Sequence, residues 1–318
     1  MDILLLILGL VLILGGANYL TDGSAIVAQR FRIPEFIIGL TVIAVGTSTP
    51  ELVVSVLSAI AGNSDVAIGN IVGSNIFNVF VILGICTIIA PIALTSSNIR
   101  RDIPIGLAVS LLLFVITSDR LLHLGITDQI GRGEGLLMIA IYIGVMWYTI
   151  RTSPRPSQQS PDHVSTEKNP AWWLSVVMIL GGLGALVAGG ELFLRGATQV
   201  ARDLGVSESV IAITLVAGGT SLPELASSLV SLMKGKAEMA LGNVIGSNIA
   251  NILLILGISS TIHPLTMGGI TPTDIGMVVL SSVALFVTAF TFRRRAIDRW
   301  EGIIFVAIYA TYIFYLLK

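Results

Sequence analysis

Two stretches of the chain repeat one another without a gap. Residues 46–84 read GTSTPELVVSVLSAIAGNSDVAIGNIVGSNIFNVFVILG, and residues 219–257 match them at 20 of 39 positions, at an offset of 173. The matches include Gly, Thr, Ser, Pro, Glu and Asn in one order, which a shared apolar composition does not produce. We therefore expect two related halves, residues 1–150 and 171–318, joined by the Pro- and Ser-rich polar linker 151–170.

Apolar runs dominate both halves. Hydrophobic residues make up 54% of the chain and charged residues only 12%, whereas soluble domains carry roughly a quarter charged residues. A helix that spans a bilayer needs about 20 mostly apolar residues. The sequence therefore predicts an all-α membrane protein with ten transmembrane helices, and a net charge of -1 gives no reason to expect nucleic acid as a partner. The predicted spans are 3–20, 35–61, 66–90, 103–118, 134–150, 171–192, 207–233, 238–262, 274–292 and 300–317.

Five spans in each half is an odd number, so the second half must enter the membrane in the opposite sense. The predicted fold is therefore two inverted five-helix repeats, an arrangement that puts a substrate site near the middle of the membrane. With the N-terminus outside, 13 of the 18 Lys and Arg residues fall on the inner side. This bias places both termini outside and the linker in the cytoplasm. The sequence does not define an oligomeric state, and a monomer is the simplest expectation.

One glutamate lies deep in an apolar span of each half, Glu51 in the second span and Glu224 in the seventh. A carboxylate at that depth is unfavourable unless it faces a cavity or a cation. No span carries a basic residue at the matching depth. Two negative charges without a protein cation would match one transported divalent cation. A protonated glutamate that forms a hydrogen bond between helices is the alternative.

Oxygen donors accompany both glutamates. Pro50 and Pro223 have no N–H, so the carbonyls of Gly46 and Gly219 lose their usual helix partners. A helix that breaks there leaves backbone oxygens free to bind ions, and hard cations such as calcium prefer oxygen ligands. Hydrogen bonding between helices is the alternative role for such side chains. The candidate hydroxyl and amide ligands are Thr47, Ser48, Ser74, Asn78, Thr220, Ser221, Ser247 and Asn251.

The motifs GTSTPE with GNIVGSNIFN, and GTSLPE with GNVIGSNIAN, resemble those of the calcium/cation antiporter superfamily, and most of all its prokaryotic sodium/calcium exchangers. They are similar to the alpha repeats of that family, here 39–84 and 212–257. Proton-coupled calcium exchangers carry GNA–E in place of GTS-x-PE, so the resemblance favours sodium as the coupling ion. It implies an integral protein of the prokaryotic plasma (inner) membrane that transports Ca²⁺ and Na⁺ without a cofactor.

The resemblance also implies a cluster of cation sites in which calcium and sodium share Glu51 and Glu224. Thr47 and Thr220 would add hydroxyl ligands, and Ser48, Ser221, Ser74 and Ser247 would line the outer sodium positions. The backbone carbonyls of Ala44 and Ala217 would also bind ions.

Two asparagines complete the implied site. Asn78 matches an asparagine of the family at the middle position. Asn251 stands where the archaeal exchangers have an aspartate, which removes one charge and leaves the ion stoichiometry open. The family also implies that spans one and six, long and tilted, slide against the other eight helices.

We therefore expect a secondary active antiporter that exchanges sodium for calcium by alternating access. An empty site would keep two bare charges in a low-dielectric centre and disfavour the transition. Protons should compete for the carboxylates, so exchange should weaken in mild acid. A proton-coupled antiporter for calcium or another divalent cation, and a cation channel, are the alternatives. The sequence contains no HExxH and no Ser-His-Asp pattern, and we do not expect an enzyme.

Overall fold

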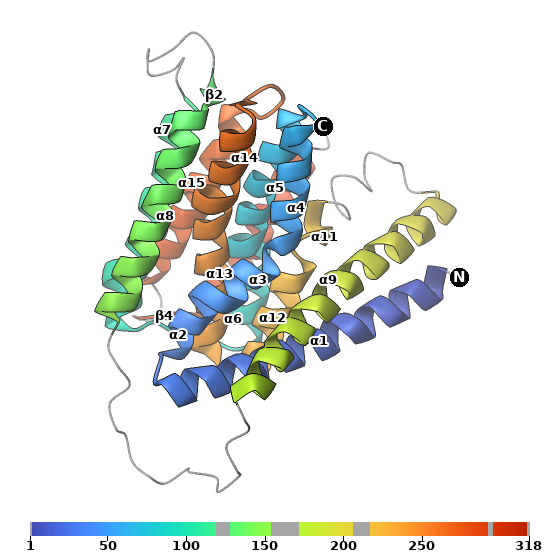
Figure 1. Ribbon diagram of the computed structural model, residues 1–318, viewed down its shortest axis with the longest axis vertical. Coiled ribbons are helices and arrows are strands. Elements are labelled where there is room, and N and C mark those ends of the chain that lie inside the picture. The colour runs from blue at the N-terminus through green and yellow to red at the C-terminus, as the bar shows by residue number, and fades with distance from the viewer. Residues whose placement is uncertain (1, 119–127, 154–171, 206–216, 292–294, 317–318) are drawn as a thin grey trace, which may run out of the picture.

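The computed structural model describes residues 2–118, 128–153, 172–205, 217–291 and 295–316. Within these ranges the chain is almost entirely helical, as predicted, with four strands of two residues each. Figure 1 shows a bundle of upright helices crossed obliquely by two long ones.

Helix occurs in the described part of every predicted span. Most of the linker 151–170, and residues 207–216 of the seventh predicted span, lie outside the described residues. The helical elements of residues 1–150, with π-helical segments written η, are α1 (Asp2–Phe31), α2 (Glu35–Ile38), η1 (Gly39–Ile43), α3 (Ala44–Thr47), α4 (Thr49–Ile60), α5 (Ser64–Phe77), η2 (Asn78–Leu83), α6 (Gly84–Ile89), η3 (Asn98–Asp102), α7 (Ile103–Ile116) and α8 (Arg132–Thr152). Those of residues 171–318 are α9 (Trp172–Asp203), α11 (Ala217–Gly219), α12 (Leu222–Met233), α13 (Ala237–Ile249), η6 (Ala250–Leu256), α14 (Gly257–Ile262), α15 (Pro272–Thr288) and α16 (Arg299–Leu316).

Several helices have the length and apolar character of membrane spans. In the described part of the chain five helices meet both requirements, and a sixth candidate forms if Glu35–Thr47 and Thr49–Ile60 count as one bent span. The ten predicted spans exceed this number because helices such as α12, of 12 residues, and α15, of 17, are shorter than the about 20 residues that cross a bilayer.

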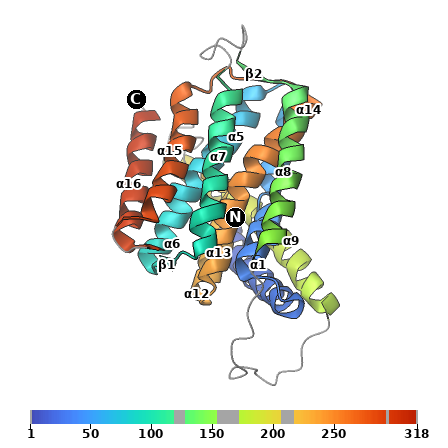
Figure 2. The same ribbon diagram turned by 90° about the vertical axis from the view of Figure 1, so that its left-hand side faces the viewer.

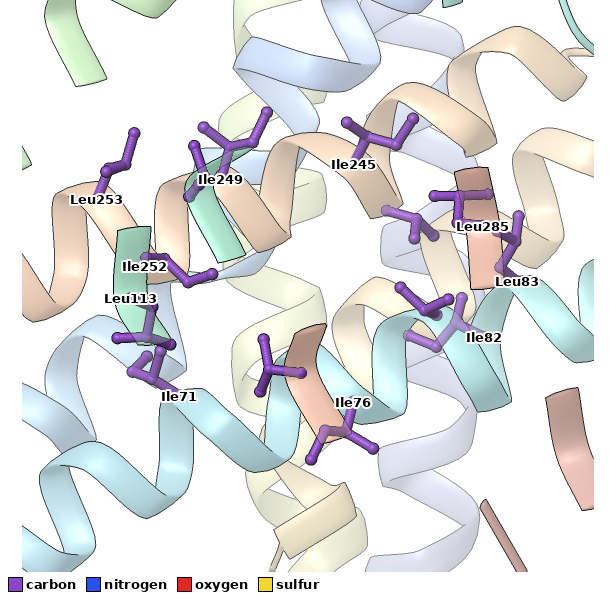
Figure 3. Close-up of a cluster of buried hydrophobic side chains, with 14 of the residues drawn as sticks. Ile71, Ile76, Ile82, Leu83, Leu113, Ile245, Ile249, Ile252, Leu253 and Leu285 are labelled. Atoms are coloured by element: carbon purple, nitrogen blue, oxygen red, sulfur yellow. The ribbon is translucent and has the colours of Figure 1, made fainter. Parts of the chain in front are cut away.

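Two continuous helical segments form the centre of the bundle. The apolar stretch of Ala237–Ile262 is 83% buried and that of Ser64–Ile89 is 72% buried, against 28% for Asp2–Phe31. Figure 3 shows isoleucine and leucine side chains from these two segments packing together, with Leu113 of α7 and Leu285 of α15 between them. The peripheral helices α1, α8 and α9 carry many large apolar side chains on their exposed surfaces, as expected of a protein surrounded by lipid.

Glycines bring α1 and α9 into backbone contact. A Cβ atom added to Gly16 would lie 2.7 Å from the Gly182 carbonyl oxygen, and one added to Gly182 would lie 2.7 Å from the Gly16 carbonyl oxygen. Gly9 and Gly189 make the same reciprocal approach at 2.8 Å. The two pairs are related by the offset of 173, and they join α1 and α9 as an antiparallel pair (Figures 1 and 2).

Two short antiparallel ribbons join the halves of the chain. Strand β1 (Ile92–Ala93) pairs with β4 (Ala296–Ile297), and β2 (Gln129–Ile130) pairs with β3 (Leu265–Thr266). The offset of 173 relates β1 to β3. The ribbons lie at opposite ends of the bundle, with β4 at the bottom of Figure 1 and β2 at the top. Each ribbon therefore consists of one strand from each half.

Gly242 and Gly246 of α13 lie close to the backbone of α2 and η1. A Cβ atom added to Gly246 would lie 2.6 Å from the Cα of Leu40, and one added to Gly242 would lie against the backbone of Phe36. Because of these contacts, α13 packs directly on the chain that leads to the first glutamate.

Candidate cation site

A helix break precedes the glutamate in each half. The helical axis bends by 46° between the segments before and after Ser48, whose ψ is 11°. Ser221 breaks the second half in the same way, with a ψ of 8°. A proline follows two residues later in each case, Pro50 and Pro223, because proline is tolerated in a first helical turn but cannot continue a helix.

The two glutamates lie in the first turns of the helices that begin after these breaks, Glu51 in α4 and Glu224 in α12. The N-terminus of a helix carries a partial positive charge, which favours an anion there. Both glutamates are completely buried, with 0% of their surface exposed. The breaks therefore place each carboxylate at a helix end inside the protein.

Each carboxylate accepts a hydrogen bond from the other half. Ser48 Oγ donates to Glu224 Oε1 at 2.8 Å, and Ser221 Oγ donates to Glu51 Oε1 at 3.0 Å. The two bonds are related by the offset of 173. Ser74 Oγ adds a third bond, to Glu51 Oε1 at 3.3 Å. These bonds involve five of the residues that we predicted as ligands from the sequence: Ser48, Glu51, Ser74, Ser221 and Glu224.

One oxygen of each carboxylate remains free. Within the described residues, Glu51 Oε2 and Glu224 Oε2 are buried and have no hydrogen-bond partner. The ion pairs of the described chain join other residues, so no lysine or arginine among them neutralises either glutamate. Two buried carboxyl groups, each with an unused oxygen, form a set of donors suited to a hard cation.

The two threonines lie next to asparagines that the sequence argument missed. Thr47 Oγ1 donates to Asn243 Oδ1 at 3.3 Å, and Thr220 Oγ1 donates to Asn70 Oδ1, also at 3.3 Å. Both asparagines belong to the repeated Gly-Asn dipeptide, and their identity in the two copies could have revealed them. Each contact again joins one half of the chain to the other.

The remaining amide candidates are buried and only partly bonded. Asn78 Nδ2 donates to Asn248 Oδ1 at 3.0 Å, while Asn78 Oδ1 has no partner among the described residues. Asn251 is 0% exposed, and both its side-chain oxygen and its nitrogen lack a described partner. Unpaired polar atoms of this kind are rare in protein interiors. Asn78 begins η2 and Asn251 lies within η6, and π-helical segments often occur at functional sites.

The backbone candidates lie close to the same breaks. The Ala44 carbonyl oxygen accepts the Ser48 amide at 3.0 Å and the Ser247 hydroxyl at 3.5 Å. Ala217 is the first residue of α11, which ends just before the second break. Each alanine therefore lies in the helical segment that comes before the break of its half.

A cavity of about 910 Å³ lies between α9 and the α4–α5 pair. Asn70 and Thr220, which lie beside the site, line this cavity, whereas Glu51 and Glu224 do not. Asp65 and Glu191 also line it. The hydrogen-bonded Asn70 and Thr220 therefore stand between this cavity and Glu51, whose backbone carbonyl accepts from Asn70.

A bundle of apolar helices around a buried pair of carboxylates is typical of a membrane protein that binds cations. The chain belongs to the sodium/calcium exchanger protein family, whose model matches residues 1–151 and 174–318. The resemblance inferred from the two motifs is thereby confirmed.

Two curated relatives cover most of the chain. The sodium/calcium exchanger MaX1 of Methanosarcina acetivorans is 31% identical, over 98% of this chain and 97% of its own length. The inner membrane protein YrbG of Escherichia coli K12 is 31% identical, over 82% of this chain and 79% of its own length. A structure of the sodium-calcium exchanger NCX_Mj soaked with zero Na⁺ and Ca²⁺ matches with a TM-score of 0.84 and 32% identity, and covers 99% of this chain and 98% of that chain.

Proposed function

We propose that the protein is a secondary active antiporter that exchanges sodium for calcium across the membrane by alternating access. One observation carries the proposal. Ser48 and Ser221 tie the two buried carboxylates to opposite halves of the chain, and each carboxylate keeps one oxygen without a described partner. A cation that binds both carboxylates would contact both halves of the chain, so its binding could control how the halves move.

The proposed ion ligands combine carboxylate, hydroxyl, amide and backbone oxygens, the donors that calcium takes in proteins. Their burial and their positions around the two helix breaks support this assignment. The proposed ligands are Glu51, Glu224, Thr47, Thr220, Ser48, Ser221, Ser74, Ser247, Asn78, Asn251 and the carbonyls of Ala44 and Ala217.

Charge explains why the exchange would be strictly coupled. One calcium ion, or several sodium ions, would neutralise Glu51 and Glu224. The empty site would keep two negative charges in a medium of low dielectric constant, where their repulsion is strong. Movement without a bound cation is therefore unfavourable, and each direction of transport would need its own ion.

We propose ten spans in two inverted five-helix halves, 1–150 and 171–318, joined by the linker 151–170. Reciprocal contacts support this architecture, because hydrogen bonds and glycine contacts of one half have counterparts in the other at an offset of 173. The two ribbons at opposite ends of the bundle support it as well.

We propose that both termini lie outside and the linker inside, in a prokaryotic inner membrane, with calcium, sodium and lipid as partners of a monomer. The distribution of Lys and Arg supports this orientation. The C-terminal end of α8 and the N-terminal end of α9 lie at the bottom of Figure 1, and the start of α5, whose first turn contains Asp65, lies toward the opposite end. The cavity lined by Asp65 would then face the outer side.

Calcium-45 uptake into proteoliposomes, with each ion gradient imposed alone, tests the proposal. An outward sodium gradient should drive uptake, and a proton gradient alone should not. Glu51→Gln should reduce uptake to background, whereas Glu134→Gln, which alters only the cap of α8, should retain it. Uptake driven by protons would instead indicate a proton-coupled antiporter. Calcium flux that needs no counter-ion would indicate a channel.

A further inference from the structure

Asn70 and Asn243 each connect several groups of the site. Asn70 Nδ2 donates to the backbone carbonyl of Glu51 at 3.2 Å and to Ser55 Oγ at 3.1 Å, while its Oδ1 accepts from Thr220. In the other half, Asn243 Nδ2 donates to the carbonyl of Glu224 at 3.3 Å.

The same amide group of Asn243 also donates to Ser227 Oγ and Ser228 Oγ, each at 2.9 Å, and its oxygen accepts from Thr47 at 3.3 Å. Ser228 is the counterpart of Ser55 at the offset of 173. Two nearly identical networks therefore surround the two glutamates.

We propose that Asn70 and Asn243 are positioning residues for the transported cation, which fix the hydroxyl of a threonine from the opposite half beside the glutamate of their own half. This inference rests on the proposed antiport. Asn70 and Asn243 are not themselves proposed ligands, and their role would be to orient two proposed ligands, Thr220 and Thr47.

The orientation of each amide follows from its partners. A backbone carbonyl can only accept a hydrogen bond, so the amide nitrogen of Asn70 must face Glu51. The oxygen must then face Thr220, whose hydroxyl can donate. The same reasoning applies to Asn243, which faces the carbonyl of Glu224 with its nitrogen. The carbonyl next to each carboxylate thereby determines the direction of the whole amide.

The direction of the hydroxyl matters for ion binding. A threonine hydroxyl has one proton and two lone pairs. A cation binds the lone pairs, so the proton must point elsewhere. Asn70 accepts the proton of Thr220 and leaves the lone pairs of that oxygen available. Thr47 has a second acceptor in its own helix, the Ile43 carbonyl at 3.0 Å, so it depends less on Asn243.

The two asparagines differ in their surroundings. Asn70 lines the cavity of about 910 Å³ together with Thr220. Asn243 is only 1% exposed, and its helix packs against α2 and η1. A cation that enters through this cavity therefore meets the Asn70–Thr220 pair before it reaches Glu51.

Cation binding to the purified, detergent-solubilised protein tests the proposal, with calcium alone and sodium alone as probes. Asn70→Ala should weaken binding about tenfold or more, as expected when an outer partner of an ion ligand is lost. Asn243→Ala should weaken it less. Ser110→Ala, which removes a buried hydrogen bond to Ser282 away from the site, should leave binding unchanged. Melting temperatures without either ion identify variants that are merely unfolded.

A double-mutant cycle separates positioning from a structural role. If Asn70 acts through Thr220, then Thr220→Ala should weaken binding in the wild-type background and add little in the Asn70→Ala background. Should Asn70→Ala fail to fold, Asn70→Asp provides the second test. It loses the N–H that the Glu51 carbonyl accepts but keeps an oxygen that accepts from Thr220, so Thr220→Ala should still weaken binding in that background.

Two outcomes would overturn the inference: full affinity in Asn70→Ala, or effects of the Asn70 and Thr220 substitutions that simply add. A wild-type protein that binds neither calcium nor sodium would instead overturn the proposed function. The two failures are therefore distinguishable in one set of measurements.

Discussion

The hydroxyl of Ser48 donates to the carboxylate of Glu224 at 2.8 Å, although the two residues are 176 positions apart in the chain. The counterpart bond from Ser221 to Glu51 measures 3.0 Å. Each serine lies at the helix break of its own half. The carboxylate that it contacts lies in the first turn of the helix that follows the break in the other half. The two breaks consequently cannot separate unless both bonds are lost, which couples the halves of the protein at its centre.

This reciprocity predicts similar effects for two distant substitutions. Ser48→Ala and Ser221→Ala should each weaken calcium binding about tenfold, because a hydrogen bond to a charged group contributes about 1.5–3 kcal/mol. The half-saturating calcium concentration for exchange in proteoliposomes is the measurement. Ser281→Ala, which removes a buried hydroxyl bonded within α15, serves as the control. A normal calcium affinity in either site variant would argue against this arrangement.

Exchange should weaken in mild acid. A protonated carboxyl group is neutral, so a proton on Glu51 or Glu224 removes the charge that the cation needs. Protons should therefore compete with calcium, and the half-saturating calcium concentration should rise as the pH falls from about 8 to about 5. The assay should use equal pH on both sides of the membrane. A flat profile over this range would exclude bare carboxylates as the ligands.

Two ion pairs join helices at the end of the bundle where α8 ends and α9 begins. Lys234 Nζ lies 2.7 Å from Asp22 Oδ1 and also donates to the Asn18 carbonyl, and Lys236 Nζ lies 2.9 Å from Glu35 Oε1. The position 173 residues before Lys234 is an alanine, and the position 173 residues after Asp22 is an arginine. The first pair thus has no counterpart at the other end of the bundle.

Loss of this pair should favour the conformation that opens at the linker end. In a Cys86→Ser background, a thiol placed in the cavity by Thr49→Cys should react about two- to fivefold more slowly in Lys234→Gln, because exposed ion pairs contribute at most about 1 kcal/mol. The exchange of charges in the double variant Asp22→Lys with Lys234→Asp should restore the rate. An unchanged rate in Lys234→Gln would show that the pair does not bias the conformations.

The glycine contacts between α1 and α9 predict that substitutions at neighbouring glycines differ greatly in their effect on the melting temperature. Gly16→Leu and Gly182→Leu should lower the melting temperature, because a side chain there would meet backbone atoms within 3 Å. Gly15→Leu and Gly181→Leu are matched controls, since a Cβ atom at either position meets no described atom within 4 Å. Equal melting temperatures for the two sets would contradict the close helix pair.

The repeated motif made the centre of the site predictable. Identical residues at an offset of 173 placed Glu51 with Glu224, and the two prolines predicted the breaks beside them. Asn70 and Asn243 were missed because an asparagine after a glycine in an apolar helix can have several roles, and the sequence does not distinguish between them. Only the packing of α5 and α13 reveals that each of them reaches the other half.

Helix lengths were less predictable than helix positions. The apolar run predicts a first span of 3–20, yet α1 continues to Phe31. The continuation contains Thr21 and Ser24, both 0% exposed, and Thr21 bonds to Ser231 of α12 at 3.2 Å. Polar residues end an apolar run in a sequence, but they do not end a helix when neighbouring helices bury them.

The two ribbons have a consequence for the assembly of the protein. Each strand finds its partner only in the other half of the chain, since β1 pairs with β4 and β2 with β3. A fragment that stops at the linker would therefore expose two unpaired edges, one at each end of the bundle. Fragments made as separate polypeptides would have to meet in the same membrane before either could complete its fold.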